Sequence, residues 1–326
     1  MSAKKVRKNQ RVRRENFDAP WKEALTVLLK ECMELLFPAV FAKIDWSRKA
    51  EFLDKELRAI ARSAKIGLRR ADKLVKVYLK DGTARWLLIH IEVQSQVDLN
   101  FPLRMLIYHV RAFEMYGREV VSLAILADEN PKWRPDQYVH GNLGCELRLK
   151  FPIVKLDDYR ARIGELMQST KPFAAVVLAI LKTQDTRGND LERKSWKFEL
   201  TKNLYRKGFN RQRIDSLYRF IDWVMHLPDN LTRKFDADIM QFEEELEMPY
   251  VTSTERNGIR KGRVEGRVEG RVEAARESIV RVLRKRFHSV PRSLKKKIDD
   301  VQEYSKLNKL LDWALDADSL KNFPLK

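Results

Sequence analysis

Hydrophobic residues in the first part of the chain change from a helical to a strand spacing. Apolar positions at helical spacing predict a helix from about Asp18, which Pro38 stops, and a second helix over 47–64. Residues 68–82 then indicate a strand that closes in an Asp-Gly turn, and residues 86–96 return as its partner. The pattern predicts two helices followed by an antiparallel β-hairpin.

The middle of the chain alternates between helix and strand. Residues 100–117 have helical spacing, and residues 120–128 form a short apolar run typical of a strand buried on both faces. With the preceding strand they indicate an α/β unit. Residues 145–156 alternate and predict one or two edge strands, and from about Ile163 onward the spacing is helical. We therefore expect an α/β core followed by a helical C-terminal region.

An internal repeat, GRVEGRVEGRVE, occupies residues 262–273. Its period of four places arginines four residues apart and glutamates four residues apart, and such like-charged pairs weaken an isolated helix, as do its glycines. The small residues permit close approach of a second helix. Two interpretations stay open: a helix that self-associates, giving a homo-oligomer, or a flexible charged linker.

Composition points to a polyanionic partner. The chain has 65 Lys and Arg against 46 Asp and Glu, a formal charge of +19, which favours nucleic acid first, an anionic membrane surface second, and solubility alone as the plain alternative. Residues 1–16 form a basic tail without the apolar stretch of a signal peptide, and the apolar run 173–181 is too short to span a bilayer. Cys32 and Cys145 alone make neither a disulfide framework nor a zinc site, so a reducing cytoplasm is the simplest setting.

A carboxylate interrupts the apolar strand WLLIHIEVQSQ. Side chains alternate between the faces of a strand, so His90, Glu92 and Gln94 share one face. In an antiparallel hairpin the start of the first strand lies beside the end of the second, so Asp72 and Glu92 are expected as neighbours. Two close carboxylates repel unless a cation lies between them, and Mg²⁺ suits oxygen ligands. The alternative is that Glu92 is a surface residue on a half-exposed sheet.

The order of these elements resembles a known nuclease family. The segments that carry the resemblance are DAPWKE, IDW, FLDKEL, ADKLVKVYLKDG, HIEVQSQ, FPLRMLIYHVRAFEMYG and LAILAD, with FPIVKL, MPYVTSTER and the repeat further along. They resemble the recombination-promoting nuclease (Rpn) family of the PD-(D/E)XK superfamily over most of the chain. The resemblance implies a restriction-endonuclease-like core, a mixed central sheet flanked by helices. It also implies an Mg²⁺-dependent DNA endonuclease in recombination or transposition.

The resemblance implies a metal site, residue by residue. Asp72 and Glu92 match the two motif acids that ligate Mg²⁺, with Mn²⁺ as a substitute, and the Val93 carbonyl matches a third ligand. Glu56, on the helix before the hairpin, matches an additional helix acid, although a solvated helix charge explains it equally.

The sequence departs from the pattern of the Rpn family at one catalytic position. Gln94 stands where that fold carries lysine, and an amide offers hydrogen bonds but no positive charge. Lys76 and Arg104 are candidates to supply the missing cation. Arg104, Tyr108 and Arg111 match the family's Arg and Tyr positions, where they would contact phosphate or brace the acids, and core packing is the alternative for Tyr108.

These observations predict five segments and a function with rivals. The segments are a basic tail (1–16), the nuclease-like core (17–185), a helical extension (186–255), the repeat region (256–275) and a small helical domain (276–326). The expected function is metal-dependent hydrolysis of DNA phosphodiester bonds. One rival is a catalytically weak, self-associating DNA-binding protein that keeps the fold. Another is a structural protein with a nonspecific basic surface.

Overall fold

The computed structural model describes residues 18–57, 73–80, 86–245, 253–287, 289–316, 319–320 and 323–324. The chain divides into two compact units, Met1–Tyr250 and Val251–Lys326. The first unit contains the sheet and most of the helices, and the second is helical in its described residues.

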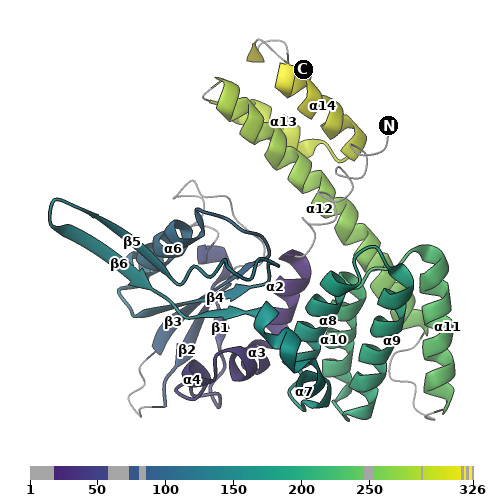
Figure 1. Ribbon diagram of the computed structural model, residues 1–326. Helices are drawn as coiled ribbons and strands as arrows, with labels where there is room; N and C mark the ends of the chain where they lie inside the picture. Colours follow the sequence, from purple (N-terminus) through teal and green to yellow (C-terminus); the bar gives the residue numbers. More distant parts are fainter. Residues whose placement is uncertain are drawn as a thin grey trace. The chain divides into compact units, whose positions relative to one another are not determined.

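The core of the first unit is a mixed five-stranded sheet in the order β1-β2-β3-β4-β7 (Figure 1). Its strands are β1 (Glu51–Phe52), β2 (Lys73–Tyr78), β3 (Trp86–Gln94), β4 (Val120–Leu126) and β7 (Ile153–Lys155). The first three run antiparallel, whereas β3, β4 and β7 run parallel. The predicted α/β class and the antiparallel pairing are confirmed, and the strand predicted at 120–128 is present as Val120–Leu126, while the predicted Asp-Gly turn lies outside the described residues.

Helix α6 (Phe101–Tyr116) makes the crossover between β3 and β4. Pro102 in its first turn has no amide hydrogen to leave unpaired, and Gly117 ends the helix in the left-handed region at φ +56°. Its inner face packs Tyr108 and Ala112 on Leu74 and Leu88 of the sheet. The predicted helix at 100–117 is confirmed.

Two predictions for the N-terminal helices need correction. The first helix is broken near Leu28 into α2 (Asp18–Val27) and α3 (Leu29–Leu36), followed by the short α4 (Pro38–Phe41). The helix predicted from Ser47 begins only at residue 54, because Glu51–Phe52 forms β1 by pairing with β2. Residues 58–64 of that prediction lie outside the described residues.

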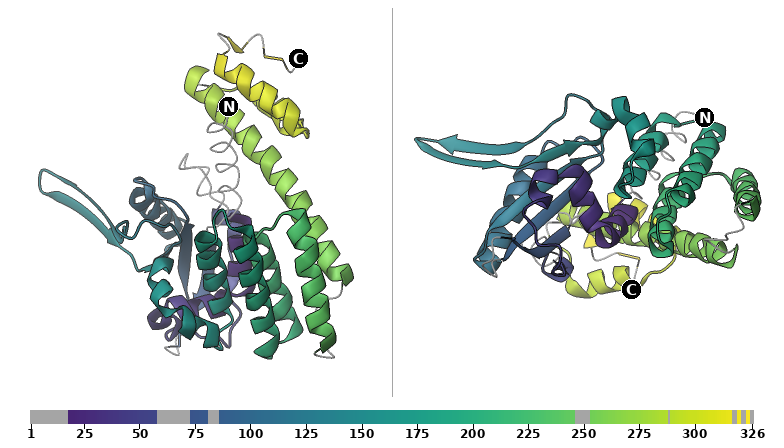
Figure 2. Two further views of the ribbon diagram at one scale, coloured as in Figure 1. Left: turned by 45° about the vertical axis from the view of Figure 1, so that its right-hand side comes forward. Right: turned by 90° about the horizontal axis from the view of Figure 1, so that it is seen from below.

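Residues 145–156 contribute two strands to two different sheets. Strand β6 (Cys145–Lys150) pairs only with β5 (Gln137–Asn142), a strand that the sequence pattern did not indicate, while β7 forms the edge of the main sheet. Figures 1 and 2 show the β5–β6 hairpin extending away from the main sheet. We call this hairpin, residues 137–150, the arm.

A helical layer completes the first unit. It consists of η1 (Leu156–Arg162), α7 (Ile163–Gln168), α8 (Phe173–Asp185), α9 (Asp190–Arg206), α10 (Arg211–Val224) and α11 (Asp229–Glu245). Helices α8, α9 and α10 pack on one another, α10 packs on α2, and α11 packs on α9. The helical character predicted from Ile163 is confirmed, and the proposed boundary at 185/186 stays a prediction. None of the helices in the described ranges is long and apolar enough to cross a bilayer.

The second unit contains α12 (Ser253–Phe287), α13 (Arg292–Asp300) and α14 (Tyr304–Asp316). The repeat lies within α12, so its backbone is helical and the linker interpretation is wrong. Val272 at the end of the repeat and Ala275 just after it belong to the same buried cluster as Leu307 and Leu310 of α14. The charges and glycines of the repeat weaken it as an isolated helix, and this packing against α14 stabilises the helix instead. Self-association through the repeat stays a prediction.

Candidate functional site

Three parallel strands end at one edge of the sheet. Gln94 of β3 is in register with Leu126 of β4, which is in register with Lys155 of β7. Residues in register share a face, so Glu92, Gln94 and Lys155 project to the face of the sheet that α6 covers. In open α/β sheets ligands bind outside the carboxyl ends of the strands, which makes this edge the candidate site.

Glu92 is fully buried at this edge and is held by Arg104 from the first turns of α6. The Arg104 Nε donates a hydrogen bond to Glu92 Oε1 at 2.6 Å, and Nη2 lies 2.5 Å from the same oxygen. A buried carboxylate is very costly unless its charge is compensated, and the guanidinium provides that compensation. The alternative that Glu92 is a surface residue is wrong.

Arg104 also joins two further groups of the β3–α6 connection. Its Nη2 donates to Gln94 Oε1 at 2.9 Å, and its Nη1 donates to Asp98 Oδ2 at 2.6 Å. The Gln94 amide in turn donates to the Gln96 carbonyl oxygen at 2.5 Å. Glu92 and Asp98 thus share one guanidinium, an arrangement that leaves the cluster electrostatically receptive to a further cation.

A second buried ion pair lies at the same edge. Lys155 Nζ donates to Asp128 Oδ2 at 2.6 Å, with the two side chains 0% and 3% exposed. The Asp128 Oδ1 accepts the backbone amide of Asn130 at 2.9 Å, and the ring of Trp133 has its centroid 5.8 Å from the ammonium. This pair locks the end of β4 to the end of β7.

His90 precedes Glu92 on the same face and is fully buried. Its ring centroid lies 4.9 Å from that of Tyr108, and neither ring nitrogen has a hydrogen-bond partner among the described residues. Burial, with smaller contributions from His109 and Arg104, lowers the pKa of His90 from 6.5 to about 3. The imidazole is therefore neutral at pH 7 and packs behind the acid.

We expect His90→Leu to reduce the loss of unfolding free energy that the protein shows as the pH falls below 7. The folded-state pKa of about 3 lies below the unfolded value of 6.5, so His90 costs stability as the pH falls below 6.5. That loss is about 2 kcal/mol between pH 7 and pH 5. Urea unfolding of both proteins at the two pH values measures it. Equal losses in wild type and variant would show that His90 is not the group responsible.

The remaining predicted site residues that the structure describes are dispersed. Asp72 lies outside the described residues, directly before Lys73, which pairs with Ile91. Lys76 lies on the Glu92 face but opposite Leu88, and it binds Glu51 at 3.3 Å.

The other predicted helix residues lie away from Glu92 as well. Glu56 lies near Tyr116. Burial raises the pKa of the Tyr116 hydroxyl, and the negative charges of Glu56 and Glu51 raise it further. Tyr116 is twelve residues beyond Arg104 in α6, a rise of about 18 Å along the helix. Arg111 is exposed and pairs with Glu114 at 2.7 Å. Of the predicted stripe, the structure brings only Arg104 to Glu92, while Tyr108 packs in the core against His90.

The backbone of Val93 is directed toward β2. The Gln94 carbonyl oxygen accepts the Ala127 amide on the β4 side of β3. Successive residues of a strand point their polar groups to opposite sides, so the Val93 carbonyl faces the β2 side, beyond Lys73. Asp72, the residue before Lys73, lies outside the described residues, so its proximity to this carbonyl stays a prediction.

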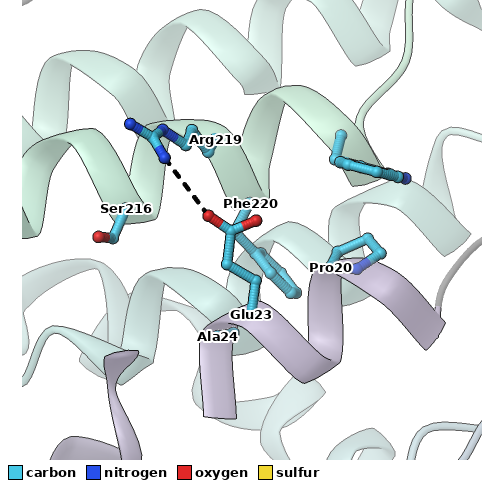
Figure 3. A pocket seen from close by; sticks show the side chains of 7 residues that line it. Pro20, Glu23, Ala24, Ser216, Arg219 and Phe220 are labelled. Atoms are coloured by element: carbon cyan, nitrogen blue, oxygen red, sulfur yellow. Dashed lines mark ion pairs between the residues drawn. The ribbon is translucent and has the colours of Figure 1, made fainter. Parts of the chain in front are cut away.

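The first unit contains one cavity away from this edge and a larger one beside it. Figure 3 shows the one between α2 and α10, where Glu23 and Arg219 pair at 3.6 Å. Its space of about 10 Å³ holds about one water, so we assign no ligand to it.

The larger cavity, about 270 Å³, runs along β7 and η1 beside the Lys155 edge. Three cations line it, but each is already paired: Arg134 with Asp158, Lys155 with Asp128, and Arg162 with Glu165. This cavity gives open space at the carboxyl edge of the sheet without a free charge to select an anion.

Sequence reasoning missed three charged residues of this edge: Asp98, Asp128 and Lys155. Asp128 lies two residues after the end of the buried strand β4, and a charged residue in that position was the available signal. Asp98 and Lys155 had no such signal: the loop before α6 brings Asp98 to Arg104, and the partner of Lys155 lies on another element of the chain.

Comparison with protein-family models, curated proteins and solved structures returns no significant match. The resemblance to the Rpn family therefore stays a prediction, and the site is argued from its own residues.

Proposed function

We propose that this chain is a metal-dependent DNA endonuclease that hydrolyses phosphodiester bonds with Mg²⁺, or Mn²⁺ in its place. The observation that carries the proposal is the buried Glu92 at the carboxyl edge of β3, with a second carboxylate and a guanidinium beside it. The order of an antiparallel hairpin, a helix and a parallel strand supports a restriction-endonuclease-like core. A role in recombination or transposition, and a cytoplasmic setting, rest on the resemblance and composition alone.

The oxygen donors at this edge fit a hard divalent cation. The Glu92 carboxylate, the Val93 carbonyl and the carboxylate of Asp72 would hold it, and such ligands are those that Mg²⁺ prefers. The ion, when bound, would lower the pKa of a bound water and polarise the scissile phosphate. The proposal requires the segment before Lys73 to bring Asp72 to Glu92.

Gln94 has a cation beside it. The Arg104 Nη2 lies 2.9 Å from the Gln94 amide oxygen, so a guanidinium stands where the fold's lysine charge is missing. A guanidinium is permanently protonated, so it can hold a phosphate or the developing charge but cannot accept a proton from water. Arg104 is thus the residue we assign to stabilising phosphate charge, with Gln94 positioning it.

One observation favours the alternative of a catalytically weak DNA-binding protein. The same Arg104 occupies Glu92 Oε1 with two donors, so it competes with a metal for that carboxylate. A protein in which this ion pair persists would keep the fold and the basic surface but cleave slowly.

The deciding experiment is cleavage of supercoiled plasmid by the full chain in Mg²⁺, Ca²⁺ or EDTA. We expect nicking or linearisation in Mg²⁺ only, and a loss of about 100-fold in Asp72→Asn and Glu92→Gln, since each removes a ligand charge. Glu114→Gln is the matched control, because Glu114 is exposed and pairs only locally with Arg111 among the contacts described.

Two results would count against the enzyme. Cleavage by Glu92→Gln at the wild-type rate would remove Glu92 from the site. Absence of cleavage in every protein, with DNA binding that falls steeply with salt, would favour the binding protein instead.

A further inference from the structure

The arm is a two-stranded ribbon that contributes nothing to the main sheet. Six residue pairs join β5 to β6, from Gln137–Lys150 at the root to Asn142–Cys145 at the tip. Most of its side chains on both faces are exposed. An isolated pair of strands is marginally stable in water, so a ribbon of this length is expected to serve a contact outside the fold.

The tip carries an apolar residue in an unfavourable conformation. Leu143 and Gly144 form the two-residue turn, with φ of +49° and +84°. Such turns favour Asn, Asp or Gly, because a branched side chain is strained there. Leu143 is nevertheless 99% exposed, so a leucine at this position stabilises neither the turn nor the hydrophobic core.

The root of the arm is fixed to the cluster that seats Arg104. The Phe151 amide donates to the Asp136 carbonyl oxygen at 2.8 Å and closes the root. Phe151, Trp133 and Leu149 pack around Phe101. The Arg104 guanidinium lies 5.3 Å from the centroid of the Phe101 ring. The arm therefore starts at the rim of the candidate site.

The two faces of the arm differ in charge. One face carries Arg148 and Lys150 with a single carboxylate, Glu146, which lies 3.5 Å from Arg148. The other face carries no formal charge and includes His140 and Leu147. Six residues of strand extend about 20 Å, farther than either groove of B-DNA is deep.

We propose that the arm enters the minor groove of a duplex bound at the Glu92 site and that Leu143 inserts between base pairs as an apolar wedge. Apolar wedges at the minor groove unstack a base step and bend the duplex, and Leu is among the residues that do so. Arg148 and Lys150 would then contact the flanking phosphates. This inference rests on the proposed function.

Charge favours DNA over a second copy of the chain as the occupant. Each copy carries +19, so two copies repel, whereas the same charge attracts a duplex. The uncharged face of the arm is a surface through which two copies could meet, and that possibility is an outcome of the test.

The test is Leu143→Asn, with Leu191→Asn as control. Asn suits a turn residue with positive φ, so the variant should fold with an unchanged or higher melting temperature. Leu191 is also an exposed leucine, 67% accessible, but lies on α9. Binding and end-to-end distance of a 30-base-pair duplex, labelled at both ends, are measured by fluorescence in Ca²⁺ at fixed salt.

We expect Leu143→Asn to bind the duplex about tenfold more weakly and to bend it less, while Leu191→Asn behaves as wild type. Equal affinity and equal bending in Leu143→Asn overturn the arm proposal and leave the proposed function standing. Absence of duplex binding by the wild type overturns both. Loss of a wild-type dimer in Leu143→Asn, seen by sedimentation, assigns the arm to a contact between copies and also overturns the proposal.

Discussion

Arg104→Met is expected to lower the free energy of unfolding by about 3–5 kcal/mol, because it removes a buried guanidinium from its carboxylates. Glu92 and Asp98 both hydrogen-bond to this side chain, and Glu92 is fully buried. Methionine fills a similar volume without the charge, so the loss reports electrostatics more than packing. Urea unfolding at pH 7 in EDTA measures it.

The same variant also tests the metal proposal without any cleavage assay. With the guanidinium gone, a divalent cation can take over its role in balancing the carboxylate charge, so Mg²⁺ or Ca²⁺ should stabilise Arg104→Met more than wild type. Arg111→Met is the control on the same helix, because Arg111 is exposed, and it should change stability by less than about 0.5 kcal/mol. If Arg104→Met loses about 3–5 kcal/mol of unfolding free energy and divalent ions do not reduce that loss, the stabilising role of the ion pair is supported and a cation site at Glu92 is not.

Local periodicity accounts for the parts of the fold that the sequence predicts. Strand β3 alternates, α6 repeats every three to four residues and β4 is apolar except for Ser122, and each pattern is set by neighbours within the element itself. The face shared by His90, Glu92 and Gln94 follows from that alternation alone.

Elements made by distant partners escape such reasoning. Strand β1 lies in a segment with helical spacing and becomes a strand only because it pairs with β2. The arm shows no buried face, so its strand β5 has no alternation to detect. In α12 the repeat has weak intrinsic helicity, yet Val272 packs with α14 and the helix is continuous.

The candidate site was predictable in its acid but not in its partners. The helical stripe from Arg104 through Tyr108 to Arg111 included the arginine that contacts Glu92, but the buried row of α6 continues from Tyr108 to Ala112 and leaves Arg111 in solvent. Asp98 joins the cluster because the loop before α6 folds back, with the Asn100 amide bound to its carboxylate at 3.0 Å. Ion-pair partners across elements depend on register, which composition does not encode.

Lys155→Met is expected to cost about 3–5 kcal/mol of stability, because Asp128 then keeps a buried charge without its ammonium. The two side chains are almost completely inaccessible, and their contact joins the ends of β4 and β7. Asp128→Asn alone should destabilise similarly by leaving Lys155 buried and charged. The double variant should recover at least half of the loss, since it buries no charge and keeps an oxygen for the Asn130 amide.

A double-mutant cycle by urea unfolding at pH 7 measures this coupling. Arg187→Met is the control, because its pair with Glu129 is 48% and 45% exposed and should contribute less than about 1 kcal/mol. Losses that simply add in the double variant would show that the buried pair is not coupled. The contacts of this pair lie at the ends of β4 and β7 and in the loop after β4, so its loss should leave the divalent-ion effect at Glu92 unchanged, whereas Arg104→Met should alter it. The two buried pairs at one edge are thus separable: one fastens strands, and the other sets the charge of the candidate site.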